Sequence, residues 1–467
     1  METMLEAPKR ISLDEWDALY AELIVAGLNE PSYGGPLRRH VTDGDYRLLK
    51  LQFDNSAAAL RLWNFLLTEE DRLHKARAAG QKIIGTMKDL GTVPVMAFAS
   101  PRLTAFYPDG AWWLPCVMEM STSDLAIADQ LGIDESFCPV RAMLGAFVNG
   151  EHFPVPDLLV CSAGAVCDDF SAIAQRLEGL GHSILWWEVP HRRVPDADEE
   201  RVKLPGGFIA PRSQVRWVKS ELERVLYALQ GIAGEPITEE LLSHGIRSAN
   251  RARTALRELR QLAYSAPVCP LPALEMLIAE MLIIHFCSDR EETILVLEEL
   301  LAEVRERVKN GVGVLPLNNA RIFWVNPVAD LRIMNALENF GGRVCGTEYL
   351  FCHALDPIPE NLDPLEALAQ MALADPMVGP AAQRAERICR DAQAFGAEAV
   401  LISRIPGASH CATEGGVMRD IIEVRLGLPV LELETPPLCD ALLPSMRTRM
   451  EALIETVKER RGNENKV

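Results

Sequence analysis

Three cysteines of this 467-residue chain stand where a thiol could do chemistry rather than fill a core. Cys138 lies in DESFCPVRAMLG, Cys167 in DLLVCSAGAVCDDF and Cys411 in PGASHCATEGG, so each comes where an apolar run meets a polar or glycine-rich turn. The carboxyl ends of parallel strands, with the helix starts that follow them, form the ligand-binding crevice of open α/β sheets. Cys167 and Cys411 each follow a strand-like run, so we expect both at such a crevice, one in each half of the chain.

Three thiolates suit one iron-sulfur cubane with one iron left open, because such clusters are normally held by cysteine. No compact C-x2-C-x2-C run occurs. Buried cysteines without a metal are common, so the spacing alone leaves a cluster and ordinary thiols both open. The chain has 11 cysteines, an odd number that argues against a disulfide framework. Cys161 and Cys345 lie in apolar runs and are expected in the core.

The elements that must position these cysteines follow from the alternation of short apolar runs with helical patterns. We expect an α/β fold with two Rossmann-like parallel-sheet domains, joined by a helical module and preceded by an N-terminal helical segment. The strand and helix alternation starts near residue 80, gives way to long charged helices, and then resumes. The expected segments, in chain order, are residues 1–78, 79–212, 213–312 and 313–467.

The formal net charge of −19 and the isoelectric point near 5.0 argue against nucleic acid or a membrane surface as a partner, because both require a basic face. The first residues include acids and lack the apolar core of a secretion signal, and no run approaches the roughly 20 apolar residues that span a bilayer. We therefore expect a cytoplasmic protein. The motifs G-x-x-x-x-G-K-[ST], H-E-x-x-H and G-x-S-x-G do not occur, so P-loop, zinc-protease and α/β-hydrolase functions have no support.

Several segments, in the same order, resemble the 2-hydroxyacyl-CoA dehydratase family, which includes subunits of ATP-dependent benzoyl-CoA reductase. They are AWWLPCVMEMSTSD, FCPVRAMLG, PDLLVCSAGAVCDDF with SILWWEVPHRR, FGGRVCGTEYLFC and AEAVLISRIPGASHCAT. The resemblance implies a [4Fe-4S] cluster held by three cysteines, and the matching positions are Cys138, Cys167 and Cys411. The family also includes reductases that hold a double cubane, with further cysteine ligands. Cys352 is a reserve ligand, because it falls two residues from a ligand position of these double-cubane relatives.

The resemblance also implies partners and a reaction. The partners are a homologous second subunit in a heterodimer and a separate ATP-hydrolysing iron-sulfur activator, and the substrate is an acyl-CoA of anaerobic metabolism. In the dehydratases one electron converts the thioester to a ketyl radical anion that expels the hydroxyl group. The leading expectation is an iron-sulfur subunit of such a dehydratase, a lyase. A benzoyl-CoA reductase-type subunit and a non-catalytic partner that relays electrons or plays a structural part remain as alternatives.

Two further features concern the substrate. Relatives often carry Cys or Ser and a Pro-x-Glu where this chain has ASPRL at residues 99–103. This departure motivates the non-catalytic alternative, because polar groups used in turnover could be missing there. Arg192 and Arg193 are candidate contacts for the CoA phosphates, since the planar guanidinium group suits phosphate oxygens.

Overall fold

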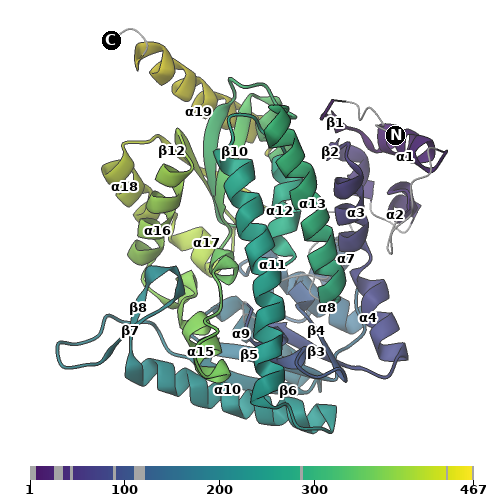
Figure 1. Ribbon diagram of the computed structural model, residues 1–467, viewed down its shortest axis with the longest axis vertical. Helices are drawn as coiled ribbons and strands as arrows, with labels where there is room; N and C mark the ends of the chain where they lie inside the picture. Colours follow the sequence, from purple (N-terminus) through teal and green to yellow (C-terminus); the bar gives the residue numbers. More distant parts are fainter. Residues whose placement is uncertain are drawn as a thin grey trace.

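The computed structural model confirms an α/β fold with two four-stranded parallel sheets among helices (Figure 1). It describes residues 7–25, 35–42, 46–87, 91–109, 121–283, 288–437 and 440–464. The segment AWWLPCVMEM, which contains Cys116 and contributes to the family resemblance, is residues 111–120 and lies outside these ranges. Within the described part of the chain, no helix combines the length and the apolar character that crossing a membrane requires.

The first sheet has the strand order β4-β3-β5-β6. Its strands are β3 (Lys82–Met87), β4 (Leu103–Phe106), β5 (Leu158–Gly164) and β6 (Ile184–Val189). Consecutive residues of β3 and β5 are buried, as expected for parallel strands with both faces covered. One face packs against α8 (Ala142–Asn149) and α9 (Asp168–Gly179). The other face packs against α5 (Val93–Ala97), α10 (Arg212–Ala233) and α15 (Pro364–Leu373).

The second sheet has the strand order β10-β9-β11-β12. Its strands are β9 (Ala320–Val325), β10 (Gly342–Glu348), β11 (Ala399–Arg404) and β12 (Val430–Glu434). Helices α16 (Ala381–Ala394) and α18 (Gly415–Leu426) cover one face. Helices α14 (Arg332–Asn339) and α19 (Leu443–Glu464) lie on the other.

Long helices lie between the two sheets and contact elements of both. Helix α11 (Glu239–Ser265) runs the length of the molecule beside α13 (Arg290–Asn310), with α12 (Ala273–Met281) next to them (Figure 1). Thr238 and Asp289 begin α11 and α13 by accepting hydrogen bonds from backbone N–H groups of the first turn, which caps each helix. The segment boundaries expected from the sequence stay a prediction.

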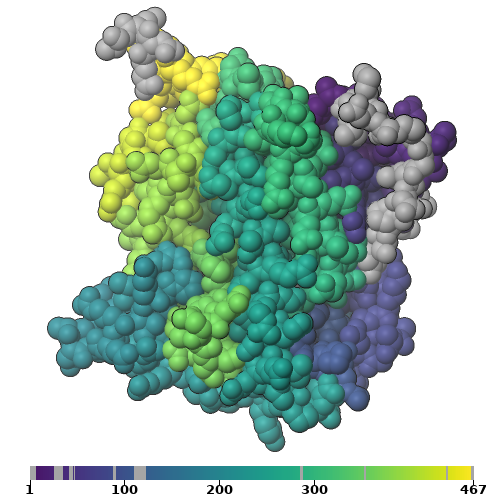
Figure 2. All heavy atoms as spheres, viewed as in Figure 1, coloured from purple at the N-terminus to yellow at the C-terminus, as the bar shows by residue number. Residues whose placement is uncertain are grey.

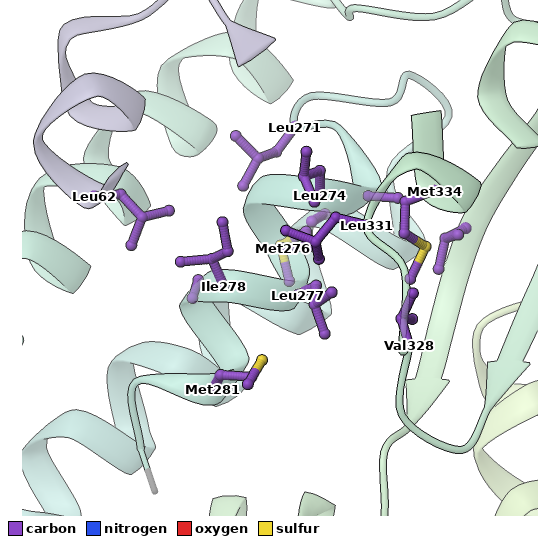
Figure 3. Packing of buried hydrophobic residues seen from close by; sticks show 14 of the residues in the cluster. Leu62, Leu271, Leu274, Met276, Leu277, Ile278, Met281, Val328, Leu331 and Met334 are labelled. Carbon is purple, nitrogen blue, oxygen red and sulfur yellow. The ribbon is translucent and has the colours of Figure 1, made fainter. Parts of the chain in front are cut away.

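One hydrophobic core joins the N-terminal helices to the second sheet. In this core, Leu62 of α3 (Ala57–Leu67) lies near Ile278 of α12, and Leu274 of α12 lies near Leu331 and Met334 (Figure 3). All of these side chains are buried, and full burial of one such side chain contributes about 1.5–3 kcal/mol. The N-terminal segment therefore packs into the same hydrophobic core as the second sheet.

The remaining elements are short or peripheral. They are β1 (Arg10–Ile11), β2 (Phe53–Asp54), α1 (Leu13–Val25), α2 (Arg38–Thr42), α4 (Glu69–Ala78), α7 (Ser121–Gln130), β7 (Arg201–Lys203), β8 (Ile209–Pro211) and α17 (Ser409–Thr413), with 3₁₀ turns at Tyr46–Lys50, Pro139–Arg141, Pro205–Gly207, Cys352–Leu355 and Pro376–Val378. The antiparallel pair β7 and β8 projects at the lower left of the space-filling view and adjoins the second half of the chain (Figure 2). There Arg390 of α16 donates to the backbone oxygen of Gly206 at 3.0 Å.

Candidate functional site

The three candidate cysteines lie on three separate segments that meet between the sheets. Cys167 directly precedes α9, which follows β5, and Cys411 lies in α17, which follows β11. Both therefore occupy the carboxyl-end edge of a parallel sheet, where α/β proteins bind ligands. Cys138 directly precedes the 3₁₀ turn that leads into α8.

A glycine allows the second half of the chain to touch the segment of Cys138. Gly407 has φ +77°, and a Cβ atom placed on it would lie 2.3 Å from the carbonyl oxygen of Phe137 and 3.2 Å from the backbone nitrogen of Cys138. Only glycine adopts this conformation and this approach without strain. The loop after β11 is therefore in close contact with the backbone of Phe137 and Cys138.

One carboxylate connects all three cysteine segments. Oδ2 of Asp169 accepts a hydrogen bond from the backbone N–H of Ser409 at 3.0 Å and lies 3.7 Å from Sγ of Cys167. Oδ1 of the same residue accepts from the backbone N–H of Cys138 at 3.4 Å. Sγ of Cys167 also lies 3.7 Å from Oγ of Ser409. Asp169 is buried, so these contacts are shielded from water.

Sequence reasoning did not single out Asp169. Its signal is the pair of acids directly after Cys167, at the start of a helix where N–H groups attract negative charge. Asp168 is exposed, whereas Asp169 is buried against the other loops. Two adjacent acids look equivalent in the sequence, and only the packing distinguishes them.

Burial and neighbouring negative charge act on the thiol of Cys138. Burial raises the pKa of Cys138 well above its usual range, and negative charge on Cys167, Asp169 and Cys411 raises it further. Cys138 also packs with Cys411 in a small apolar cluster that includes Ile405. The structure therefore brings the three predicted cysteines into one neighbourhood, while their binding of a cluster stays a prediction.

A buried cation interacts electrostatically with Cys411. Arg384 of α16 is fully buried and donates to Oε2 of Glu348 at 2.9 Å, to Oε2 of Glu414 at 3.0 Å and to Oδ1 of Asn326. Burial alone would lower the pKa of Arg384, but Glu348, Glu414 and Cys411 outweigh burial and raise it. The guanidinium group thus remains charged and attracts negative charge at Cys411.

The donor set fits an iron-sulfur group. Sulfur ligands suit iron-sulfur clusters, and the three thiols come from segments that Asp169 and Gly407 hold in contact. The positive charge of Arg384 and the start of α9 at Cys167 both favour an anionic centre.

Two other cysteines lie inside strands of the two sheets. Cys161 in β5 and Cys345 in β10 are buried, as predicted. Burial raises the pKa of Cys345 to about 12 and also raises that of Cys161. Cys352, the reserve ligand, lies in a 3₁₀ turn, and its side chain is outside the part of the structure that is described.

The structure corrects the expected role of Arg192. This residue is fully buried, and its guanidinium group donates to the backbone oxygen of Asp375 at 3.0 Å and to Oε1 of Gln383 at 3.1 Å. Burial lowers the pKa of Arg192 to about 10. A guanidinium enclosed in this way has no surface to offer a CoA phosphate. Arg193 is exposed and paired with Glu199, and its contact with CoA stays a prediction.

The departure at residues 99–103 lies at the edge of the first sheet opposite Cys167. This segment leads into β4, which runs parallel to β3 and β5, so it occupies the amino-end edge of the first sheet. Oγ of Ser100 there donates to Oε1 of Glu235 at 2.6 Å. Cys167 follows the carboxyl end of β5, at the opposite edge. The departure therefore lies at the opposite edge of the first sheet from Cys167.

Comparisons with known proteins agree with the resemblance read from the motifs. The family model for the D-component of 2-hydroxyglutaryl-CoA dehydratase matches residues 95–457. A search of curated proteins gives no significant match. Because the family model covers most of the chain, this chain belongs to the 2-hydroxyglutaryl-CoA dehydratase D-component family. It is accordingly a component of a dehydratase of the 2-hydroxyacyl-CoA type.

Proposed function

We propose that this member of the family is the iron-sulfur subunit of a 2-hydroxyacyl-CoA dehydratase, and that Cys138, Cys167 and Cys411 hold one [4Fe-4S] cluster. The observation that carries the proposal is that the three segments bearing these thiols converge on the carboxylate of Asp169, and that the Cys138 thiol interacts electrostatically with Cys167 and Cys411. The charged neighbours of the buried thiol of Cys345, by contrast, are Arg321, Arg343 and Glu398, which include no second thiol.

When bound, such a cluster supplies one electron at a potential that reaches down to about −700 mV in proteins. The residues of this chain hold and shield it. Asp169 accepts hydrogen bonds from the backbone N–H groups of Cys138 and Ser409 and so connects their segments to that of Cys167. Ile405 and Ala408 form apolar surroundings for Cys411. A dry site limits the loss of the electron to protons. Arg384 adds a fixed positive charge that offsets negative charge at the thiolates.

The partners follow from the same proposal. We infer a homologous second subunit, an ATP-hydrolysing iron-sulfur activator that provides the electron, and an acyl-CoA substrate with a hydroxyl group at carbon 2. Such chemistry requires an oxygen-free cytoplasm.

Metal analysis of anaerobically purified protein tests the cluster. We expect four iron and four sulfide per chain, in keeping with one cubane, and loss of both in Cys138→Ser, Cys167→Ser and Cys411→Ser. Cys345→Ser is the matched control, since Cys345 is also buried but lies in the middle of a strand. A colourless, iron-free wild-type protein, or equal iron in all four variants, contradicts the proposal.

Substrate tests then separate the reactions. With partner and activator present, a 2-hydroxyacyl-CoA is expected to lose water, whereas an aromatic CoA thioester is expected to remain unchanged. Reduction of the aromatic thioester would instead assign the chain to the benzoyl-CoA reductase type. Full activity with Cys411→Ser in the complex would assign it a non-catalytic part.

A further inference from the structure

A second group of metal-ligating side chains lies beside the segment of Cys138. Asp124 belongs to α7, and Glu151 and His152 follow Gly150, which ends α8 with φ +74°. One ligand atom from each of these three side chains lies within 4.8 Å of the other two. They supply two carboxylates and one imidazole, a donor set for a divalent cation.

Two polar atoms in this group are buried without a hydrogen bond. Asp124 is 0% exposed and His152 is 8% exposed. Oδ2 of Asp124 and Nε2 of His152 lie 3.3 Å apart, within the range of an ion pair if the ring is protonated, yet among the described residues neither atom makes a hydrogen bond. A buried carboxylate oxygen and a buried ring nitrogen are costly to leave unsatisfied. A cation between them satisfies both.

The neighbouring residues hold these atoms in place. Nδ2 of Asn149 donates to Oδ1 of Asp124 at 2.8 Å and to Oε2 of Glu151 at 3.3 Å, while its Oδ1 accepts from the backbone N–H of Glu151 at 3.0 Å. Asn149 thus orients both carboxylates and leaves Oδ2 of Asp124 directed at His152. Outer contacts of this kind orient the ligands of protein metal sites.

The backbone at this point is strained and tightly packed. His152 has φ +73°, which is uncommon for a residue other than glycine, and Phe153 next to it packs against Phe147 in the core. A Cβ atom on Gly145 of α8 would lie 2.3 Å from Cα of Asp124, so α7 and α8 are in close contact. Asp124 and the turn after α8 therefore have fixed relative positions.

We propose that Asp124, Glu151 and His152 bind a divalent transition-metal ion, of the class of Mn²⁺ or Zn²⁺, at a site separate from the cysteines. Oxygen and imidazole donors suit these ions, whereas the cysteines favour thiophilic ones. The side chain of Glu151 is 62% exposed, which provides a path for the ion and room for water ligands. The bound ion braces the α7 and α8 pair, and α8 begins at the turn that carries Cys138.

Mn²⁺ binding to the full chain tests the site, because Mn²⁺ prefers oxygen and nitrogen donors to thiolates. The free Mn²⁺ signal in electron paramagnetic resonance measures binding directly. We expect one Mn²⁺ per chain, displaced by Zn²⁺, and an affinity reduced about ten-fold or more in Glu151→Gln and His152→Asn. His152→Asn is chosen because asparagine tolerates a positive φ.

Glu178→Gln is the matched control, since Glu178 is exposed on α9 in the same half of the chain. Its Mn²⁺ affinity is expected to equal that of the wild type. Wild-type protein that binds no Mn²⁺, or variants of Glu151 and His152 that bind as tightly as the wild type, would overturn the proposal. Since Glu151 is exposed, its variant is expected to fold, so a loss of binding reports on the site. The iron content of the cysteine site is a separate measurement, and its failure would leave this result unaffected.

Discussion

Replacement of Gly407 by alanine tests whether close contact between the two halves assembles the cysteine site. The added Cβ atom would lie 2.3 Å from the carbonyl oxygen of Phe137 and 2.6 Å from its carbonyl carbon, where ordinary contact between heavy atoms needs about 3.5 Å. The two segments must therefore separate by about 1 Å. The positive φ of Gly407 adds about 1 kcal/mol.

Together these effects predict a loss of about 3 kcal/mol in the free energy of unfolding for Gly407→Ala. Gly427→Ala is the matched control, because Gly427 has φ +63° but nothing lies within 4 Å of its added Cβ atom. That variant carries the backbone cost alone, about 1 kcal/mol. The contrast between the two variants isolates the close contact.

Urea unfolding and thiol labelling of iron-free protein measure the difference. We expect a lower unfolding midpoint for Gly407→Ala than for Gly427→Ala, together with faster modification of Cys138, whose segment Gly407 contacts. Equal midpoints and equal labelling rates in the two variants would refute the reasoning. The chain exceeds the size at which two-state unfolding is the rule, so midpoints with matched slopes are the quantities to compare.

Three further predictions concern buried charges. Asp169→Asn is expected to lower the iron content and to destabilise the protein by about 1–3 kcal/mol, because the carboxylate accepts hydrogen bonds from backbone N–H groups of two segments. Asp168→Asn is the control: Asp168 is exposed, so neither the iron content nor the stability should change. Arg384→Gln should cost about 3–5 kcal/mol in urea unfolding at neutral pH, because it leaves buried carboxylates without their cation. Arg390→Gln, which removes an exposed cation on the same helix, should cost little, and equal costs for the two variants would contradict the role of burial. Burial raises the pKa of Glu275 to about 8, so the folded state holds a proton that the unfolded state releases, and stability should fall as pH rises from about 4.5 to about 8. Glu275→Gln should make this fall smaller, with the part due to Glu338, whose pKa burial raises to about 7, remaining; an unchanged pH profile would count against the shift.

The charged residues show where reasoning from sequence fails. Arg192 and Arg193 are neighbours of identical type, yet one is enclosed by backbone oxygen atoms and the other is exposed. Asp168 and Asp169 differ in the same way. Burial of a charge depends on which distant segments cover it, and neighbours in the sequence carry no information about that.

The sequence by itself determined the two strand and helix alternations, the helices between them, the family and the positions of Cys167 and Cys411 at strand ends. These follow from local periodicity and from motifs within one segment. Only the tertiary structure decided that Asp169 contacts Ser409, 240 residues away, that the charge of Arg384 acts on Cys411, and that Asp124 faces His152. The physical reason is that such contacts arise from the packing of whole elements, which hydrophobic burial drives without regard to separation along the chain.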